Sequence, residues 1–133
     1  MKAVWIFFFS SLLMVEAASP VISKAFIYYI PFQFETYEAI TPKNIKEKAK
    51  FKIEINDKDK ISALLDLTSG GEKTSNCDEK RVRLLIVWDE GKQQVIADAD
   101  GNVLNGKTRQ ALNAQSFEKL KNLLSDLIKA KGP

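Results

Sequence analysis

The sequence predicts a single α+β domain in which a mainly antiparallel sheet carries about three helices. Short segments that alternate apolar and polar residues are typical of half-buried strands, and longer segments with apolar residues every three or four positions are typical of amphipathic helices. The chain has 133 residues, of which 45% are hydrophobic and 28% charged, as expected of one globular domain. The predicted element order is β-α-β-α-β-β-(β)-α, without an internal repeat or an interdomain linker.

The first predicted strand covers residues 24–34, where aromatic and β-branched residues recur with a period of two. Pro31 lacks a backbone N–H and cannot complete a strand ladder, so it indicates an edge strand or a bend. The period predicts that the strongly apolar face carries Phe26, Tyr28, Ile30, Phe32 and Phe34.

A short helix is predicted to begin at Thr41 and to end near Lys50. Thr41 is a favourable N-cap residue, and Pro42 suits the first helical position because an N–H there would have no helical partner. Ile40 and Ile45 have the spacing of a hydrophobic staple across this helix start.

Residues 51–55 alternate apolar and charged side chains, which predicts a half-buried strand with one solvated face. Asp57 is then placed to cap a second helix, which we expect to end before Gly70. The apolar residues whose spacing predicts this helix are Ile61, Leu64 and Leu65.

Residues 69–79 are polar and rich in glycine, and we expect them to form an exposed loop. Residues 82–88 are almost continuously apolar, as in a central strand that is covered on both faces. A turn at residues 89–92 then predicts a hairpin with a partner strand at residues 94–98.

The pairs Asp100-Gly101 and Asn105-Gly106 predict two turns with positive φ at the glycine, and therefore a small meander of strands. The last helix is expected over residues 116–129, with one apolar face and one polar face. Its apolar face is predicted to consist of Phe117, Leu120, Leu123, Leu124, Leu127 and Ile128.

Residues 1–17 have the order of a secretory signal peptide: a lysine near the amino terminus, a 12-residue apolar run and small residues at the exit. The run is shorter than the roughly 20 residues that a permanent membrane helix needs. Cleavage after Ala17 leaves Val15 and Ala17 at the two positions before the cut where small side chains are expected. Cleavage after Ala18 would place Glu16 at one of these positions. We therefore expect a periplasmic or secreted domain of residues 18–133, with an uncleaved anchor or a buried first strand as the alternatives.

The residue types present restrict the chemistry that this chain can perform. It contains no histidine, which excludes Ser-His and Cys-His nucleophile pairs, histidine-ligated zinc and an imidazole general base. Its one cysteine, Cys77, excludes an intrachain disulfide and a thiolate zinc site. We expect no cofactor and no metal ion. A net charge of only +3 and the lack of a known nucleic-acid-binding motif argue against nucleic acid as a partner.

Asp98, Asp100 and Asn102 have the i, i+2, i+4 spacing that opens a calcium-binding EF-hand loop. Such a loop has glycine at its sixth position and glutamate at its twelfth, where this chain has Val103 and Arg109. A hairpin turn therefore explains these three residues better than a calcium site does.

Cys77 lies in the predicted polar loop, where we expect an accessible free thiol. Arg81 and Arg83 are near enough in the sequence to lower its pKa, but no histidine is available as a base, so catalysis is its least favoured role. An intermolecular disulfide, a redox-sensitive thiol and an incidental free thiol remain as alternatives.

Residues 69–79 and the turns at residues 98–106 are predicted to present a partner-binding surface, since binding residues concentrate on loops held by a rigid scaffold. The candidate partner-binding residues are Glu72, Lys73, Asn76, Arg81, Arg83, Asp98, Asp100 and Asn102. A separate basic patch is predicted on one face of the first helix, although a solvated helix face explains these lysines better than a binding role does. This patch consists of Lys43, Lys46 and Lys50.

The favoured function is that of a small exported protein, without catalytic activity, that binds another envelope or secreted protein. An inhibitor or an immunity protein is its most concrete form. The alternative is an envelope accessory protein whose lysine patch contacts an anionic polymer or a membrane surface. A histidine-independent hydrolase that uses Asp98 and Asp100 is the third hypothesis. The oligomeric state is left open by the sequence.

Overall fold

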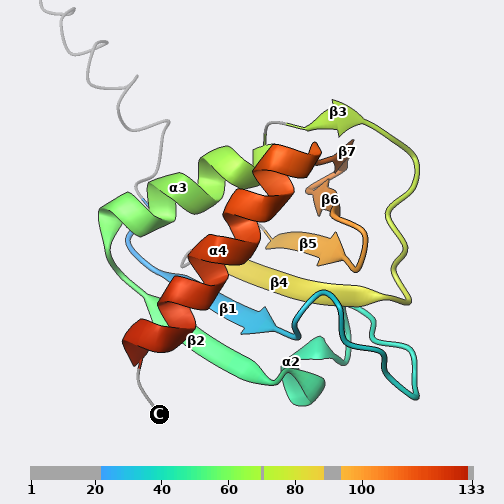
Figure 1. The fold of residues 1–133 in the computed structure, drawn as a ribbon, viewed down its shortest axis with the longest axis horizontal. Coiled ribbons are helices and arrows are strands. Elements are labelled where there is room, and N and C mark those ends of the chain that lie inside the picture. The colour runs from blue at the N-terminus through green and yellow to red at the C-terminus, as the bar shows by residue number, and fades with distance from the viewer. Residues whose placement is uncertain (1–21, 70, 89–93, 132–133) are drawn as a thin grey trace, which may run out of the picture.

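One antiparallel sheet organises the structure (Figure 1). Within residues 22–69, 71–88 and 94–131, which the computed structural model describes, this sheet has seven strands in the order β2-β1-β4-β5-β6-β7-β3. The strands are β1 (Ala25–Tyr29), β2 (Phe51–Ile55), β3 (Glu72–Lys73), β4 (Val82–Trp88), β5 (Gln94–Asp98), β6 (Asn102–Asn105) and β7 (Thr108–Ala111). The helices of this part of the chain are α2 (Ile45–Lys48), α3 (Lys58–Ser69) and α4 (Ala114–Lys131).

Two long helices cover one face of the sheet. Figure 1 shows α3 and α4 lying across the same face, and their apolar side chains form one core with the residues of the strands beneath them. The period of the α4 sequence explains its position, because Leu120, Leu124 and Leu127 recur on one side of the helix and are all buried. From the sheet, the residues of this core include Ala25, Ile27, Ile53, Ile55, Leu84, Ile86, Trp88, Val95, Ala97 and Val103.

On the opposite face of the sheet, the chain between β1 and β2 covers the part over β4 and β5. This segment includes α2, and it buries a second, smaller apolar cluster against β4 and β5. The cluster consists of Ile30, Ile40, Ile45, Val82, Leu85 and Ile96, with Tyr28, Val87 and Leu104 partly buried beside it. The two central strands β1 and β4 are therefore packed on both faces.

The predicted α+β architecture and most of its elements are confirmed. Residues 82–88 form a central strand, and β4 and β5 form an antiparallel pair. Asp57 caps α3, since its Oδ1 accepts the N–H of Asp59 at 2.8 Å. The turn glycines Gly101 and Gly106 have φ values of 86° and 64°, as the sequence predicts. The predicted signal peptide and the turn between β4 and β5 lie outside the described residues.

The prediction for the first strand was wrong in its length and its buried face. β1 ends at Tyr29, and Ala25, Ile27 and Tyr29 face the helix core, rather than Phe26 and Tyr28. Because both faces of β1 are covered, both sets of alternating residues are apolar, and their period does not distinguish the two faces. β1 is also a central strand and not an edge strand.

Pro31 follows β1 and belongs to a bend, since its carbonyl accepts the N–H of Phe34 at 3.0 Å. The next helix is shorter than predicted. Thr41 Oγ1 accepts the N–H groups of Lys43 and Asn44 in the turn before the helix, but the N-cap of α2 is Asn44. α2 spans only residues 45–48, and Ala49 is already extended, with ψ at 139°. The predicted exposed loop contains β3, whose Glu72 pairs with Ala111 of β7.

Candidate functional site

A buried carboxylate joins two loops at one end of the sheet. Asp98 is the last residue of β5, and only 1% of its surface is exposed. Its Oδ1 accepts the N–H groups of Asp100 and Asn102, each at 2.9 Å. Its Oδ2 accepts the N–H of Asp78 at 2.9 Å and the side-chain amide of Asn102 at 3.2 Å. Residues 74–81 and 98–102 are thereby held as one unit, which we call the loop cluster.

Cys77 is buried inside the loop cluster, which contradicts the expected accessible thiol. It is 8% exposed, and its Sγ lies 3.7 Å from the carbonyl oxygen of Asn102. Burial, with the negative charge of Asp98 nearby, raises the pKa of Cys77 to about 11. A reactive thiol needs a lowered pKa, so the position of Cys77 is that of a packed side chain and not of an activated nucleophile.

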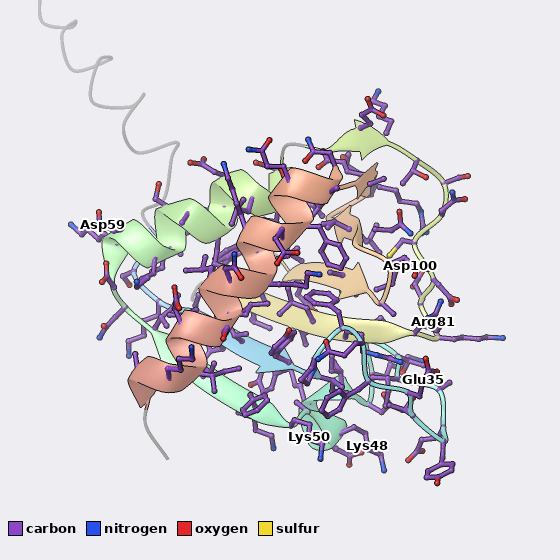
Figure 2. All side chains as sticks on the ribbon, viewed as in Figure 1. Glu35, Lys48, Lys50, Asp59, Arg81 and Asp100 are labelled. Atoms are coloured by element: carbon purple, nitrogen blue, oxygen red, sulfur yellow. The ribbon has the colours of Figure 1, made fainter. Side chains whose placement is uncertain are left out.

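Two exposed ion pairs mark the outer surface of the loop cluster. Arg81 Nη1 lies 3.2 Å from Asp100 Oδ2, and Figure 2 shows the two residues near each other at the start of β4. Arg109 Nη2, from β7, lies 3.3 Å from Glu79 Oε2. Asn76 precedes Glu79 and Arg81 in the same loop and is exposed. Charges of both signs therefore alternate over a small area.

The predicted binding residues are divided by the structure into an exposed set and a buried set. Glu72 and Lys73 are exposed on β3, at the edge of the sheet beside the loop cluster. Asn102 is half-buried and directs its amide toward Asp98. Burial also removes Asp98 and Arg83 from the surface where the sequence had placed them.

Arg83 has a structural position beneath the segment that follows β1. It is 2% exposed, and its Nε and Nη2 donate to the carbonyl oxygen of Phe34 at 3.2 and 3.0 Å. Its Nη1 donates to the carbonyl oxygen of Val82 at 3.0 Å. Burial, with the positive charge of Arg81 nearby, lowers the pKa of Arg83 below its ordinary value. The guanidinium thus fastens residues 31–40 to the sheet.

The three lysines of the predicted basic patch are all exposed, but they do not share one helical face. Lys43 precedes α2, and Lys50 follows its extended C-cap. Lys46 stands over the ring of Tyr28 at 5.8 Å. The single-turn helix is too short to align side chains across two turns, so the patch is a loose group of cations.

The sequence did not predict a groove that is lined by Lys48 and Lys50. It has a volume of about 260 Å³ and lies between the segment after β1 and the chain that follows α2. Phe34 and Tyr37 are the exposed large apolar side chains of the described residues, and both line it. Figure 2 shows Glu35, Lys48 and Lys50 on this side of the molecule. The sequence shows two aromatic residues within four positions, but only the structure shows that both are exposed.

Glu79 and Arg109 also join the surface of the loop cluster without having been predicted. Arg109 belongs to β7, so only the sheet pairing brings it to the loop. Over the described ranges, no group of three His, Cys, Asp or Glu side chains is arranged to hold a metal ion. No helix in the same ranges has the length and hydrophobicity of a membrane span. No protein-family model, curated protein or solved structure matches this chain.

Proposed function

We propose that this chain is an exported protein that binds another protein through the loop cluster, in the manner of an inhibitor or an immunity protein. The observation that carries the proposal is the fourfold hydrogen bonding of Asp98, which fixes two loops before any partner arrives. A surface that is already ordered loses little conformational entropy on binding. Loops on a rigid scaffold are also where binding residues concentrate.

The charges on the loop cluster support a protein partner over a uniformly charged polymer. Arg81 and Arg109 are each matched by a carboxylate within 3.3 Å, so the surface presents both signs. Such a surface selects a partner with a complementary pattern of charges. A polyanion or an anionic membrane would instead be attracted by a field of one sign.

The lysine patch supplies the second candidate function, contact with an anionic envelope surface. Lys43, Lys46 and Lys50 are exposed, but Lys48 between them is paired with Glu38 at 2.9 Å. The two functions differ in their response to salt. Binding through the lysines should weaken steeply as ionic strength rises, whereas an interface with a buried centre should weaken less.

The pair of carboxylates considered for hydrolysis is not arranged for that purpose. Asp98 is buried and both of its oxygens accept hydrogen bonds within the protein, while Asp100 is exposed and pairs with Arg81. A general acid or base must reach its substrate within hydrogen-bonding distance. In this conformation the buried carboxylate of Asp98 cannot reach a substrate.

Site-specific photo-crosslinking in the producing organism tests the proposed function. A photoreactive residue in place of Asn76 should give one discrete adduct with another protein. The same residue in place of Asp59 should not, because Figure 2 places Asp59 at the opposite end of the molecule from Arg81 and Asp100. The adduct at residue 76 should be reduced by the double variant Arg81→Glu, Arg109→Glu. Equal crosslinking from both positions, or none from residue 76, contradicts the proposal.

The expected export has its own test. Mass spectrometry of the protein from culture medium and from an envelope fraction should find Ala18 as the amino-terminal residue. An intact amino terminus in the cytoplasmic fraction alone would contradict export, and with it the proposed class of partner.

A further inference from the structure

The sheet ends at β2, and the sequence of this edge strand is self-complementary. β2 pairs with β1 in the register Ile27↔Ile53, and the described residues contain no further strand beyond it. An edge strand of five residues is a template for pairing with another strand. Whether it attracts or repels a given strand depends on the side chains placed opposite one another.

The register of the sheet shows which residues of β2 direct their backbone outward. Ile30, just after β1, donates its N–H to the carbonyl of Arg83 at 2.8 Å. Every second residue before it, Tyr28 and Phe26, therefore directs its backbone N–H and C=O groups toward β4. The remaining residues of β1 direct their backbone N–H and C=O groups toward β2, where they pair with Phe51, Ile53 and Ile55. In an antiparallel ladder the residues between these, Lys52 and Glu54, turn their N–H and C=O groups to the outer edge.

Lys52 and Glu54 also place opposite charges on the same face of the strand. Their side chains alternate with the buried Ile53 and Ile55 and are exposed. Glu54 Oε2 lies 3.4 Å from Nζ of Lys24, the residue before β1, but both side chains are about half exposed, and such a contact is weak. The edge therefore carries one cation and one anion, two residues apart, at the positions whose backbone groups face outward.

We propose that β2 forms an antiparallel pair with β2 of a second copy of this chain, in the register that places Lys52 opposite Glu54 of the second copy. The twofold axis then passes between the two Ile53 residues, and each charge pair occurs twice. The outward backbone groups of Lys52 face those of Glu54, as a hydrogen-bonded pair requires. A shift of one copy by two residues would instead set Lys52 against Lys52, or Glu54 against Glu54.

A charge of one sign on this edge would repel a second copy in every register, and natural edge strands often use charge for that purpose. The mixed signs of β2 leave one register attractive and penalise its neighbours. The pairing does not involve the loop cluster, which lies beyond β4 and β5. It is therefore independent of the proposed function, and either could fail without the other.

Sedimentation equilibrium tests the proposal on protein purified after expression of the full chain. The wild-type protein should dimerise, and the single variants Lys52→Glu and Glu54→Lys should each dimerise about 10- to 100-fold more weakly, because both charge pairs become repulsive. An equimolar mixture of the two variants should form a heterodimer at least as well as the wild type, because every opposing pair in it is again of opposite sign. The double variant Lys52→Glu, Glu54→Lys should recover self-association.

The matched controls are Glu72→Lys and Lys73→Glu, which make the same changes of charge on β3 at the other edge of the sheet. They should leave the dimer unchanged. A wild-type chain that stays monomeric up to its solubility limit overturns the proposal. So does a dimer that both single variants retain, or a mixture of the single variants that fails to associate.

Discussion

Asp78 donates its backbone N–H to Oδ2 of Asp98 at 2.9 Å and so joins two segments that are 20 residues apart in the sequence. Asp98→Ala removes this acceptor and leaves three backbone donors without their partner. Unmade hydrogen bonds of this kind are costly, and we expect the free energy of unfolding to fall by about 2–4 kcal/mol. Urea denaturation followed by circular dichroism measures this loss.

The control for Asp98 is Asp100→Ala, two residues further along the same turn. Asp100 is exposed and makes a surface ion pair with Arg81, so its removal should change the stability by only about 0.5 kcal/mol. If both variants lost the same stability, the buried carboxylate would not be what holds the loop cluster together.

Cys77 gives a prediction for alkaline pH. Its pKa is raised from 9.0 to about 11 in the folded protein, so between these values the folded state holds a proton that the unfolded state has released. The stability contributed by the neutral thiol is complete below pH 9 and is lost as the pH rises toward 11. Urea midpoints should therefore fall more steeply over this range for the wild type than for Cys77→Ala.

Burial also raises the pKa of Tyr29, so both proteins should lose some stability at high pH, and the difference between them isolates Cys77. The same thiol should react slowly with a disulfide reagent at pH 8 and rapidly in urea. Rapid reaction in the folded protein would contradict its buried position.

The two turn glycines form a matched pair of test sites. Both have positive φ, but a Cβ at Gly101 would lie 3.1 Å from ring carbons of Phe117, whereas a Cβ at Gly106 would meet nothing within 4 Å. Gly106→Ala should lower the free energy of unfolding by about 1 kcal/mol, because a residue with a Cβ is strained in the left-handed conformation. Gly101→Ala should cost about 2–4 kcal/mol because it adds the contact with the ring. Thermal unfolding of both variants measures the difference.

The hydrogen bonds that Arg83 donates to Phe34 should hold the segment after β1 against the sheet. Arg83→Met keeps most of the buried volume but removes both hydrogen bonds to the carbonyl of Phe34. We expect the amides of Phe34 and Ile40 to exchange with deuterium about tenfold faster, and the stability to fall by about 1–2 kcal/mol. Arg81→Met, two residues away and exposed, should leave both quantities unchanged. Unaltered exchange in Arg83→Met would show that other contacts hold the segment.

Local signals in the sequence predicted the elements whose causes are local. Asp57 caps α3, the spacing of Leu120, Leu124 and Leu127 defines the buried side of α4, and the glycines mark their turns. The buried face of β1 was not predictable in this way. That face depends on β4 and α4, which lie far along the chain, and both sides of the strand are apolar.

The candidate site was only partly predictable for the same reason. Asp98 and Arg83 are charged residue types that are rarely buried, so composition favours the surface for both. Their burial follows from donors and acceptors supplied by distant segments, Asp78 for the first and Phe34 for the second. Cys77 was assigned to an exposed loop because its neighbours are polar, but the loop folds inward over it.

The central position of β1 has a consequence for the order of folding. Strands β4 to β7 follow one another along the chain, and each pairs with the next, so their meander closes through short loops. β1 pairs with β4 across a long intervening segment, and a contact of such sequence separation forms slowly because more chain entropy is lost in closing it. We expect the β4–β7 meander to form first and β1 to pair with β4 late. Until then, one edge of the apolar strand β4 has no neighbouring strand.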